Sequence, residues 1–432
     1  MILNKNTLVL AVIGSAAIGV GISFAEIYLF HFLLIILGFF GFFKLSKSNY
    51  LFDISLFSNK NILFLLIMFI WYLVSIIWSP SLSFSLKYLF YLFCGITITI
   101  LVVQFSNSKK KLDSLFNLLS IIFSIELVIA LMESFTSFRW PISPYSSWHS
   151  FFRKDSVDFF TYSNPLFYSQ FQPPTGFHWN TNNLAITMLM ILPFFLCSKK
   201  LQINIIGSIS ISLIIFFSSS RAVFLGLVLV YSFYLLFIKK QVRTLSLIWI
   251  IISSLFIGIN NLQNSLNPRV NEIANSFNAV QLYLKGDLDI GGSLEWRREL
   301  INDGIVHLKK SKGIGVGAGG STALQNELGG VAGRFTSMHN FWVEILVEGG
   351  VFIALLLLLW YLKLIYNLFL VSRNNSKRNI RYYSNSLILS MIAFLPAAVA
   401  ASSTIYFFPM WIMFGLSIAV IRLGNNSVDF II

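Results

Sequence analysis

The chain has 432 residues, of which 56% are hydrophobic and only 11% are charged. Soluble domains carry roughly 25% charged residues, so this composition excludes a soluble enzyme held by a single membrane anchor. The formal net charge of +14 does not indicate a nucleic-acid partner. Lys and Arg gather in short clusters at the ends of apolar runs, whereas nucleic-acid binding calls for a basic stripe on a soluble module.

Apolar runs of about 20 residues, the length that crosses a bilayer, recur along the whole chain. We therefore expect an all-α, polytopic membrane protein of about 12 transmembrane helices. The first run is interpreted as a retained helix rather than a signal peptide, because a second span follows at once. The expected spans are 7–24, 26–43, 61–78, 83–105, 112–133, 180–198, 202–218, 221–238, 243–260, 339–362, 384–402 and 404–422.

The basic residues predict the orientation of these spans. If the N-terminus is cytoplasmic, every even-numbered span ends on the cytoplasmic side, where Lys and Arg are enriched. Both termini are therefore expected in the cytoplasm. The breaks on that side hold Lys44, Lys47 and Lys60; Lys109, Lys110 and Lys111; Lys199 and Lys200; Lys239, Lys240 and Arg243; and Arg373, Lys377, Arg378 and Arg381.

Two segments on the opposite side are long, and long loops are usually functional or disordered. The first is rich in aromatic residues, and the second is the largest polar stretch of the chain. Helical spacing of apolar residues around Leu300 and Leu308 predicts that the second segment, between spans nine and ten, forms a folded cap. We expect transmembrane helices in 1–133, an aromatic loop in 134–179, helices in 180–260, the cap in 261–338, and helices with a cytoplasmic tail in 339–432.

Three arginines on the outer side are candidates for binding an anionic group. Arg221 follows Ser218-Ser219-Ser220 between two closely spaced spans, which would hold it at the outer interface. An interfacial arginine that snorkels towards water is the alternative. Arg297 and Arg298 form a basic pair in the large loop, where a solvated helix face is the alternative.

A histidine and two carboxylates mark the point where the large loop re-enters the membrane. His339 begins this span, and a histidine there can accept a proton near neutral pH. A purely structural histidine is the alternative interpretation. Glu344 and Glu348 follow on one helix face, and carboxylates at the edge of a span must face protein or water.

Two further segments are rich in residues that bind ligands or shape the backbone. Residues 313–320 include five glycines, which allow either a ligand or neighbouring backbone to approach closely. A dinucleotide site is not indicated, because no βαβ pattern surrounds these glycines. The Asn residues of 180–183 could cap the following helix or bind sugar hydroxyl groups.

Four segments, taken in order, resemble the O-antigen ligase and polymerase superfamily of membrane glycan transferases. Together they cover roughly residues 170–360, and the hydropathy profile extends the resemblance to the whole chain. Within the resemblance, spacing to the glycines favours Arg297 over Arg298. The segments are Pro174-Thr175-Gly176-Phe177 with Asn180, Asn182 and Asn183; Ser219-Ser220-Arg221; Arg297 followed by Gly313-Ile314-Gly315-Val316-Gly317; and His339-Asn340 with Trp342, Glu344, Glu348 and Gly350.

The resemblance implies a GT-C-like protein of the bacterial cytoplasmic (inner) membrane, with an extracytoplasmic active site. It implies an undecaprenyl-diphosphate-linked oligosaccharide donor, a glycan or glycolipid acceptor, and neither cofactor nor metal. Arg221 and Arg297 would stabilise the leaving diphosphate, and His339 would take the proton of the acceptor hydroxyl, which inverts the anomeric carbon. Further contacts with substrate are expected from Arg298, Asn340, Glu344, Gly315, Gly317 and Asn183.

The motifs leave three functions open. A polymerase would join lipid-linked repeat units, and we favour this function. A ligase would move the finished chain to lipid A core or to another acceptor. A transporter of lipid-linked sugar is the competing class, but it would distribute charge through many spans, whereas Glu126 and Glu133 are the main intramembrane charges here. A non-catalytic assembly subunit is a further alternative.

Overall fold

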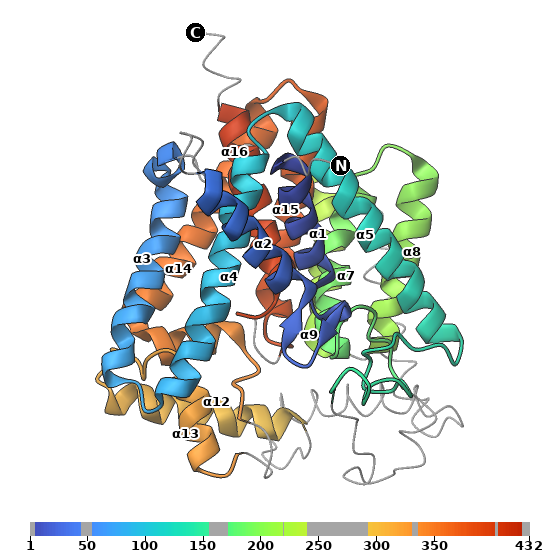
Figure 1. Cartoon of the computed structure of the whole chain (residues 1–432). Helices are drawn as coiled ribbons and strands as arrows, with labels where there is room; N and C mark the ends of the chain where they lie inside the picture. The colour runs from blue at the N-terminus through green and yellow to red at the C-terminus, as the bar shows by residue number, and fades with distance from the viewer. Residues whose placement is uncertain are drawn as a thin grey trace.

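A computed structural model describes residues 5–44, 54–154, 172–218, 220–239, 293–330, 336–401 and 405–425. These residues form a bundle of helices, with two further helices lying across one end (Figure 1). The helices are α1 (Lys5–Ile18), α2 (Leu29–Lys44), α3 (Lys60–Val74), α4 (Leu82–Phe105), α5 (Lys109–Phe135), α7 (Thr181–Leu196), α8 (Leu201–Ser218), α9 (Arg221–Phe233), α12 (Ser293–Lys310), α13 (Gly320–Glu327), α14 (Phe341–Asn374), α15 (Arg378–Ala397) and α16 (Phe408–Asn425).

Shorter elements extend or connect these helices. Single-turn 3-10 segments cover Gly19–Gly21, Ile54–Ser58 and Ser75–Trp78, and a π-helical turn at Tyr234–Lys239 continues α9. Strands β1 (Ser23–Phe24) and β2 (Ile27–Tyr28) form an antiparallel ribbon in which Ser23 pairs with Tyr28. The ribbon joins α1 to α2 through a tight turn at Ala25, which has a φ of 50°. This short ribbon is a detail that the all-α prediction did not include.

Each predicted span other than 243–260 overlaps a helix, although 7–24 runs past α1 into β1. Within the described residues, seven helices are long and apolar enough to cross a membrane, so the chain is an integral membrane protein. The predicted span 243–260 lies outside the described residues. Helices Lys5–Gly21, Leu29–Phe39 and Thr181–Leu196 are apolar but shorter. The long candidates are Lys60–Trp78, Leu82–Phe105, Lys109–Phe135, Leu201–Ser218, Arg221–Lys239, Phe341–Asn374 and Phe408–Asn425.

Helix α14 continues well past residue 362, where the sequence analysis ended that span. Leu364, Leu368 and Val371 continue its buried face, at the spacing of three and four residues that places side chains on one side of a helix. The helix ends only where the basic cluster begins at Arg373. The basic cluster therefore spans the turn from α14 to α15, with Arg373 at the end of α14 and Arg378 at the start of α15.

The two ends of the bundle differ. The beginning of α1 and the end of α16 lie at one end, whereas α12, α13 and the described part of the aromatic loop lie at the other (Figure 1). Helix α12 packs on α14 and buries Leu300 and Leu308, which agrees with the helical spacing in the sequence. We call α12, the glycine segment 313–320 and α13 the cap.

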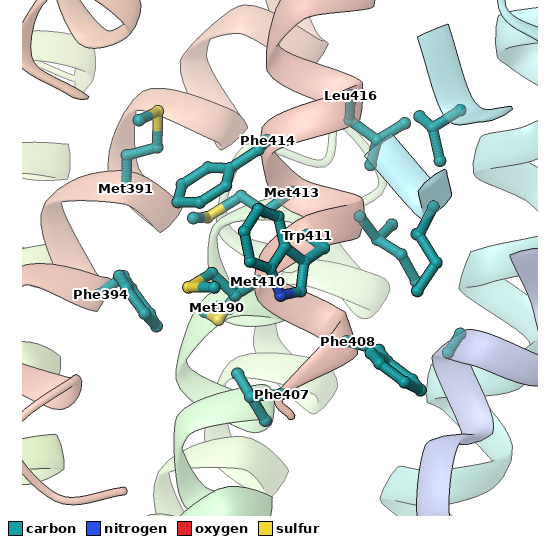
Figure 2. Packing of buried hydrophobic residues seen from close by; sticks show 14 of the residues in the cluster. Met190, Met391, Phe394, Phe407, Phe408, Met410, Trp411, Met413, Phe414 and Leu416 are labelled. Carbon is teal, nitrogen blue, oxygen red and sulfur yellow. The ribbon is translucent and has the colours of Figure 1, made fainter. Parts of the chain in front are cut away.

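Helix α16 is the most buried of the seven long apolar helices, with 83% of its apolar window inside the protein. Its residues Trp411 and Phe414 point into a layer of aromatic and methionine side chains that includes Met391 and Phe394 of α15 (Figure 2). Thr99 of α4 donates a hydrogen bond of 3.0 Å from its hydroxyl to the carbonyl oxygen of Trp411. Helix α16 is therefore the centre of the bundle.

A glycine makes room for this central helix. A Cβ atom at Gly95 of α4 would meet the indole ring of Trp411, and Trp411 itself is 2% exposed. Small residues let helices approach closely within membranes, where packing rather than the hydrophobic effect drives association. The contact between α4 and α16 therefore depends on the missing side chain at position 95.

The substitution Gly95→Ala should lower the thermal midpoint of unfolding of the purified protein in detergent. Overpacking a core typically costs about 1–3 kcal/mol, and the Trp411 ring has no space to withdraw into. Gly38→Ala in α2 is the matched control, because an added Cβ there meets no atom within 4 Å. Equal midpoints for the two variants would contradict the proposed contact.

Candidate functional site

The C-terminal end of α15 is where the predicted site elements meet. Arg297 of α12 donates hydrogen bonds from Nη1 to the carbonyl oxygen of Val399 (2.9 Å) and from Nη2 to that of Ala400 (3.4 Å). The backbone N–H of Phe341, which begins α14, donates to the carbonyl oxygen of Ala398 (3.1 Å). Helix α9, which begins at Arg221, also packs along α15. The cap and the ends of three long helices therefore share one junction.

Arg221, Arg297 and His339 lie close enough to influence one another's charge. Burial, and then the nearby charge of Arg221, lowers the pKa of Arg297. Burial, and then the charge of Arg297, lowers the pKa of His339 to about 4. The backbone contacts at Ala398, Val399 and Ala400 place Arg297 and the start of α14 at one junction, and these shifts agree with that placement. Two guanidinium groups beside a neutral imidazole make a site that favours an anion.

The two loop arginines have different surroundings. Arg297 is partly buried against α15, whereas Arg298 is exposed on α12. The choice of Arg297 over Arg298 as the residue that binds the diphosphate stays a prediction. The contact with substrate predicted for Arg298 stays a prediction. In the Ser219-Ser220-Arg221 motif, Ser219 lies outside the described residues, and Ser220 precedes α9 as its N-cap residue.

His339 is held in an unusual backbone conformation directly before α14. Its φ of 48° lies in the left-handed region, which few residues other than glycine adopt but which His and Asn tolerate better than most. Asn340 then caps α14, since its side chain accepts a hydrogen bond from the backbone N–H of Val343 (3.3 Å). A cap fixes the helix start, so Asn340 positions His339 whether or not it also contacts substrate.

The two carboxylates of α14 are both buried, as their shared face predicts. Glu344 is 4% exposed and Glu348 is 1% exposed. Glu348 accepts a hydrogen bond from the Ser321 hydroxyl on Oε1 (2.6 Å) and from the Gly319 backbone N–H on Oε2 (3.2 Å). Glu348 therefore holds the cap to the bundle. Of the two carboxylates, Glu344 is nearer to His339 in the sequence.

The glycine segment packs against protein backbone. A Cβ atom at Gly317 would lie 2.7 Å from the carbonyl oxygen of Ser75, and a Cβ atom at Gly315 would meet the backbone of Glu348 and Gly350. Of the two alternatives open from the sequence, these contacts give Gly315 and Gly317 a packing role. Their predicted contact with substrate stays a prediction.

The Asn cluster at the start of α7 has at least one capping member. Asn180 is the N-cap residue, and its Oδ1 accepts a hydrogen bond from the backbone N–H of Asn182 (2.7 Å). Asn183 differs, because its Oδ1 is buried and has no hydrogen-bond partner among the described residues. A buried acceptor without a partner usually meets water or a ligand, which keeps Asn183 a candidate for substrate contact.

A buried carboxylate, named in the sequence analysis without a role, fixes the turn before α7. Glu133 of α5 accepts hydrogen bonds from the backbone N–H groups of Trp140 (2.8 Å), Thr175 (2.7 Å) and Gly176 (2.7 Å). It thereby joins the aromatic loop to the Pro-Thr-Gly-Phe motif. The signal that could have found this role is the carboxylate itself, because a Glu in an apolar span needs a buried partner.

A second buried pair lies beside this turn. Nε2 of His178 is 3.2 Å from Oε1 of Glu126 and 2.9 Å from the hydroxyl oxygen of Thr187. All three residues are buried. The sequence analysis noted Glu126 as an intramembrane charge but did not pair it with His178, because the two are 52 positions apart in the chain.

Tyr406 is a further residue that the sequence gave no reason to select. Burial, and then the charges of Glu344 and Glu348, raises the pKa of its phenol above the ordinary range. Its ring lies 4.3 Å, between centroids, from that of Tyr91. Tyr406 thus lies near the carboxylates of α14.

Among the described residues, no group of three or more His, Cys, Asp or Glu side chains is placed to hold a metal ion.

Comparisons with known proteins bear on this geometry. The model of the O-antigen ligase family matches residues 206–359, a range that contains Arg221, Arg297 and His339. The chain is also similar to the teichuronic acid biosynthesis protein TuaE of Bacillus subtilis (strain 168), with 27% identity over 375 residues, 85% of this chain and 72% of that protein. The resemblance to the O-antigen ligase and polymerase superfamily is confirmed. The superfamily implies a membrane environment and lipid-linked glycan substrates.

Replacing Glu133 by Gln should destabilise the protein, because the amide group of Gln turns one acceptor into a donor that opposes a backbone N–H. A buried group left without a partner costs about 1–3 kcal/mol. The measurement is the thermal midpoint of unfolding. Glu26→Gln is the matched control, since Glu26 forms an exposed ion pair with Lys87 and such pairs contribute little. If Glu133→Gln and Glu26→Gln unfold at the same temperature, the proposed role of Glu133 in holding the turn before α7 is wrong.

Proposed function

We propose that the protein transfers a glycan from undecaprenyl diphosphate to a sugar hydroxyl on the extracytoplasmic side of the bacterial cytoplasmic membrane, and that it polymerises the repeat units of a surface polysaccharide. The family match and the similarity to TuaE support a role in cell-surface polysaccharide biosynthesis. The observation that carries the proposal is the junction after α15, where Arg297 donates to the carbonyl oxygens of Val399 and Ala400 and the start of α14, next to His339, bonds that of Ala398. Both chain termini then lie in the cytoplasm, opposite the cap.

The reaction places each of these residues in a distinct role. The acceptor oxygen forms a bond to the anomeric carbon of the donor as the bond to the diphosphate oxygen breaks, and the electron pair leaves with the diphosphate. Arg221 and Arg297 stabilise the charge that develops there, as preorganised donors do. His339 takes the proton of the acceptor hydroxyl. Direct displacement inverts the anomeric carbon.

The hydrogen bonds of Arg297 leave it able to bind an anion. A guanidinium has five N–H donors, and among the described residues Arg297 donates two hydrogen bonds, to the carbonyl oxygens of Val399 and Ala400. Those two contacts fix the plane of the group, so the remaining donors are oriented before the donor substrate binds. Fixed donors contribute more to a transition state than mobile ones, because little reorganisation accompanies the reaction.

The burial of His339 suits it to act as a base. A histidine in contact with bulk water is partly protonated near pH 6.5, and the protonated form cannot accept a proton. With its pKa lowered to about 4 by burial and by the charge of Arg297, His339 is neutral throughout the physiological range. Diphosphate binding beside Arg297 adds negative charge, which raises the pKa and makes the imidazole a stronger base when the donor is present.

One assay tests the proposed activity and separates polymerase from ligase. Purified protein is incubated with lipid-linked repeat units alone, and the products are resolved by size. A ladder of lengths is the expected result. A product that forms only after a separate acceptor is added would assign the chain to the ligase group. The absence of product in both assays, from protein that is correctly folded, would contradict the glycosyl-transfer proposal.

The variants His339→Asn and Arg221→Ala should abolish the ladder. Loss of a general base costs about 10²–10⁴-fold in rate, and loss of one electrostatic donor costs about 10²–10³-fold. Asn is chosen because it tolerates the left-handed backbone of position 339 but cannot take a proton, so a folding defect is avoided. Lys309→Gln, an exposed cation on α12, is the matched control. Ladders of normal intensity from both site variants would refute the assigned roles.

The rate of transfer should be insensitive to acid until an unusually low pH. Since only neutral His339 accepts a proton, kcat/KM should hold from neutral pH to roughly pH 5 and fall as the pH approaches about 4. The unfolded chain binds this proton near pH 6.5 but the folded protein only near pH 4, so stability already falls as the pH drops from about 6.5 to about 4. Helicity is therefore followed by circular dichroism at each pH. A fall in kcat/KM near pH 6.5, in protein that is still folded, would contradict the assignment of His339 as a buried, neutral base.

A further inference from the structure

A pocket lies at the end of the bundle opposite the cap, away from the site described above. It has a volume of about 330 Å³ and lies where the start of α3 faces the far ends of α14 and α16 (Figure 1). Its polar lining consists of three cations and several carboxamides, and it includes Lys60, Lys363, Arg422, Asn61, Asn367 and Asn425.

Among the described residues that line this pocket, the charges are all of one sign. Lys60, Lys363 and Arg422 come from three different helices, and no acidic side chain is among the lining residues. Within the described part of the chain, none of the three cations forms an ion pair. Cations that converge without a carboxylate repel one another, and an anion between them removes that repulsion.

Lys363 is the most informative of the three residues. It is the single charged residue of α14 between Glu348 and Arg373, within a run of leucine and aromatic residues. A lysine in such a run is costly unless it reaches water or an anion. Asn367, four positions further along, lies on the same helix face and also lines the pocket. The helix therefore presents an ammonium group and a carboxamide together.

The beginning of α3 adds backbone donors to the same place. Asn59 is its N-cap residue, and its side chain accepts a hydrogen bond from the backbone N–H of Asn61 (2.9 Å). The first turn of a helix carries a partial positive charge and N–H groups that favour anions. In α3 this effect coincides with the side-chain cations of three helices around one cavity.

We propose that this pocket binds a phosphate-bearing anion on the face opposite the cap. Lys60, Lys363 and Arg422 would contact the charged oxygens, and the carboxamides would donate hydrogen bonds to the neighbouring hydroxyl or ester groups. Two sources can supply such an anion at a membrane surface: the headgroup of an anionic phospholipid and a soluble phosphate compound. The pocket is remote from Arg221, Arg297 and His339, so this proposal does not depend on glycan transfer.

The test uses the full-length protein in a detergent without phosphate groups. Thermal midpoints are recorded by tryptophan fluorescence during titration with short-chain phosphatidylglycerol, with inorganic phosphate, and with zwitterionic short-chain phosphatidylcholine. The variants are Arg422→Gln alone and Arg422→Gln combined with Lys363→Met. The matched control is Lys110→Gln, an exposed cation at the start of α5, which tests for a general effect of surface charge.

Phosphatidylglycerol should raise the midpoint of the wild-type protein and of Lys110→Gln. The half-saturating concentration should rise about tenfold in Arg422→Gln, as expected when one charge-assisted hydrogen bond is lost, and the response should disappear in the double variant. A response to phosphatidylglycerol alone assigns the site to a lipid headgroup, whereas an equal response to inorganic phosphate assigns it to a soluble anion.

Two results would overturn the proposal. One is a wild-type midpoint that neither anion raises. The other is an equal loss of response in Lys110→Gln and in the pocket variants, because the effect would then reflect surface charge in general. The single Arg422→Gln variant guards against misfolding of the double variant, since Arg422 is only partly buried. Failure of the glycan-transfer assay would leave these results unchanged.

Discussion

The break in α14 at Gly350 is the constraint on which the rest of the site depends. With φ of 80° and ψ of 172°, this glycine interrupts the helical hydrogen-bond ladder, and the freed groups pair with the cap. The carbonyl oxygens of Val347 and Glu348 accept from the backbone N–H groups of Val316 (2.9 Å) and Gly317 (3.1 Å). The backbone N–H of Val351 donates to the carbonyl oxygen of Gly313 (2.9 Å). Buried backbone groups must find partners, so kink and cap require each other.

This pairing sets where the charged groups lie. Because the glycine segment is fixed to α14, the preceding helix α12 is held against the bundle, and Arg297 reaches the carbonyl oxygens that follow α15. Helix α14 itself begins directly after His339 and Asn340. Arg297 is therefore positioned by backbone carbonyl oxygens, and the two arginines bring positive potential to this end of the bundle.

Much of this arrangement was predictable from the sequence, because hydropathy and basic clusters reflect the bilayer directly. The mostly helical architecture and the helix around Leu300 agree with the structure, whereas the number of spans and the choice of Arg297 over Arg298 stay predictions. The role of the glycines was not predictable, since the same lack of a side chain serves a ligand or a neighbouring backbone. The pairing of His178 with Glu126 also had no local signal, because it depends on how α5 packs against a distant turn.

The contact between Gly95 and Trp411 has a consequence for movement during a reaction cycle. The indole ring of Trp411 fills the space left by the missing side chain at Gly95, and the backbone carbonyl oxygen of Trp411 accepts a hydrogen bond from the Thr99 hydroxyl. Helix α16 therefore cannot slide or rotate along α4 without a steric collision. Packed interfaces of this kind resist continuous deformation. A long lipid-linked chain must therefore enter and leave around a stationary central helix, by rearrangement at the periphery of the bundle and not by rocking of two halves.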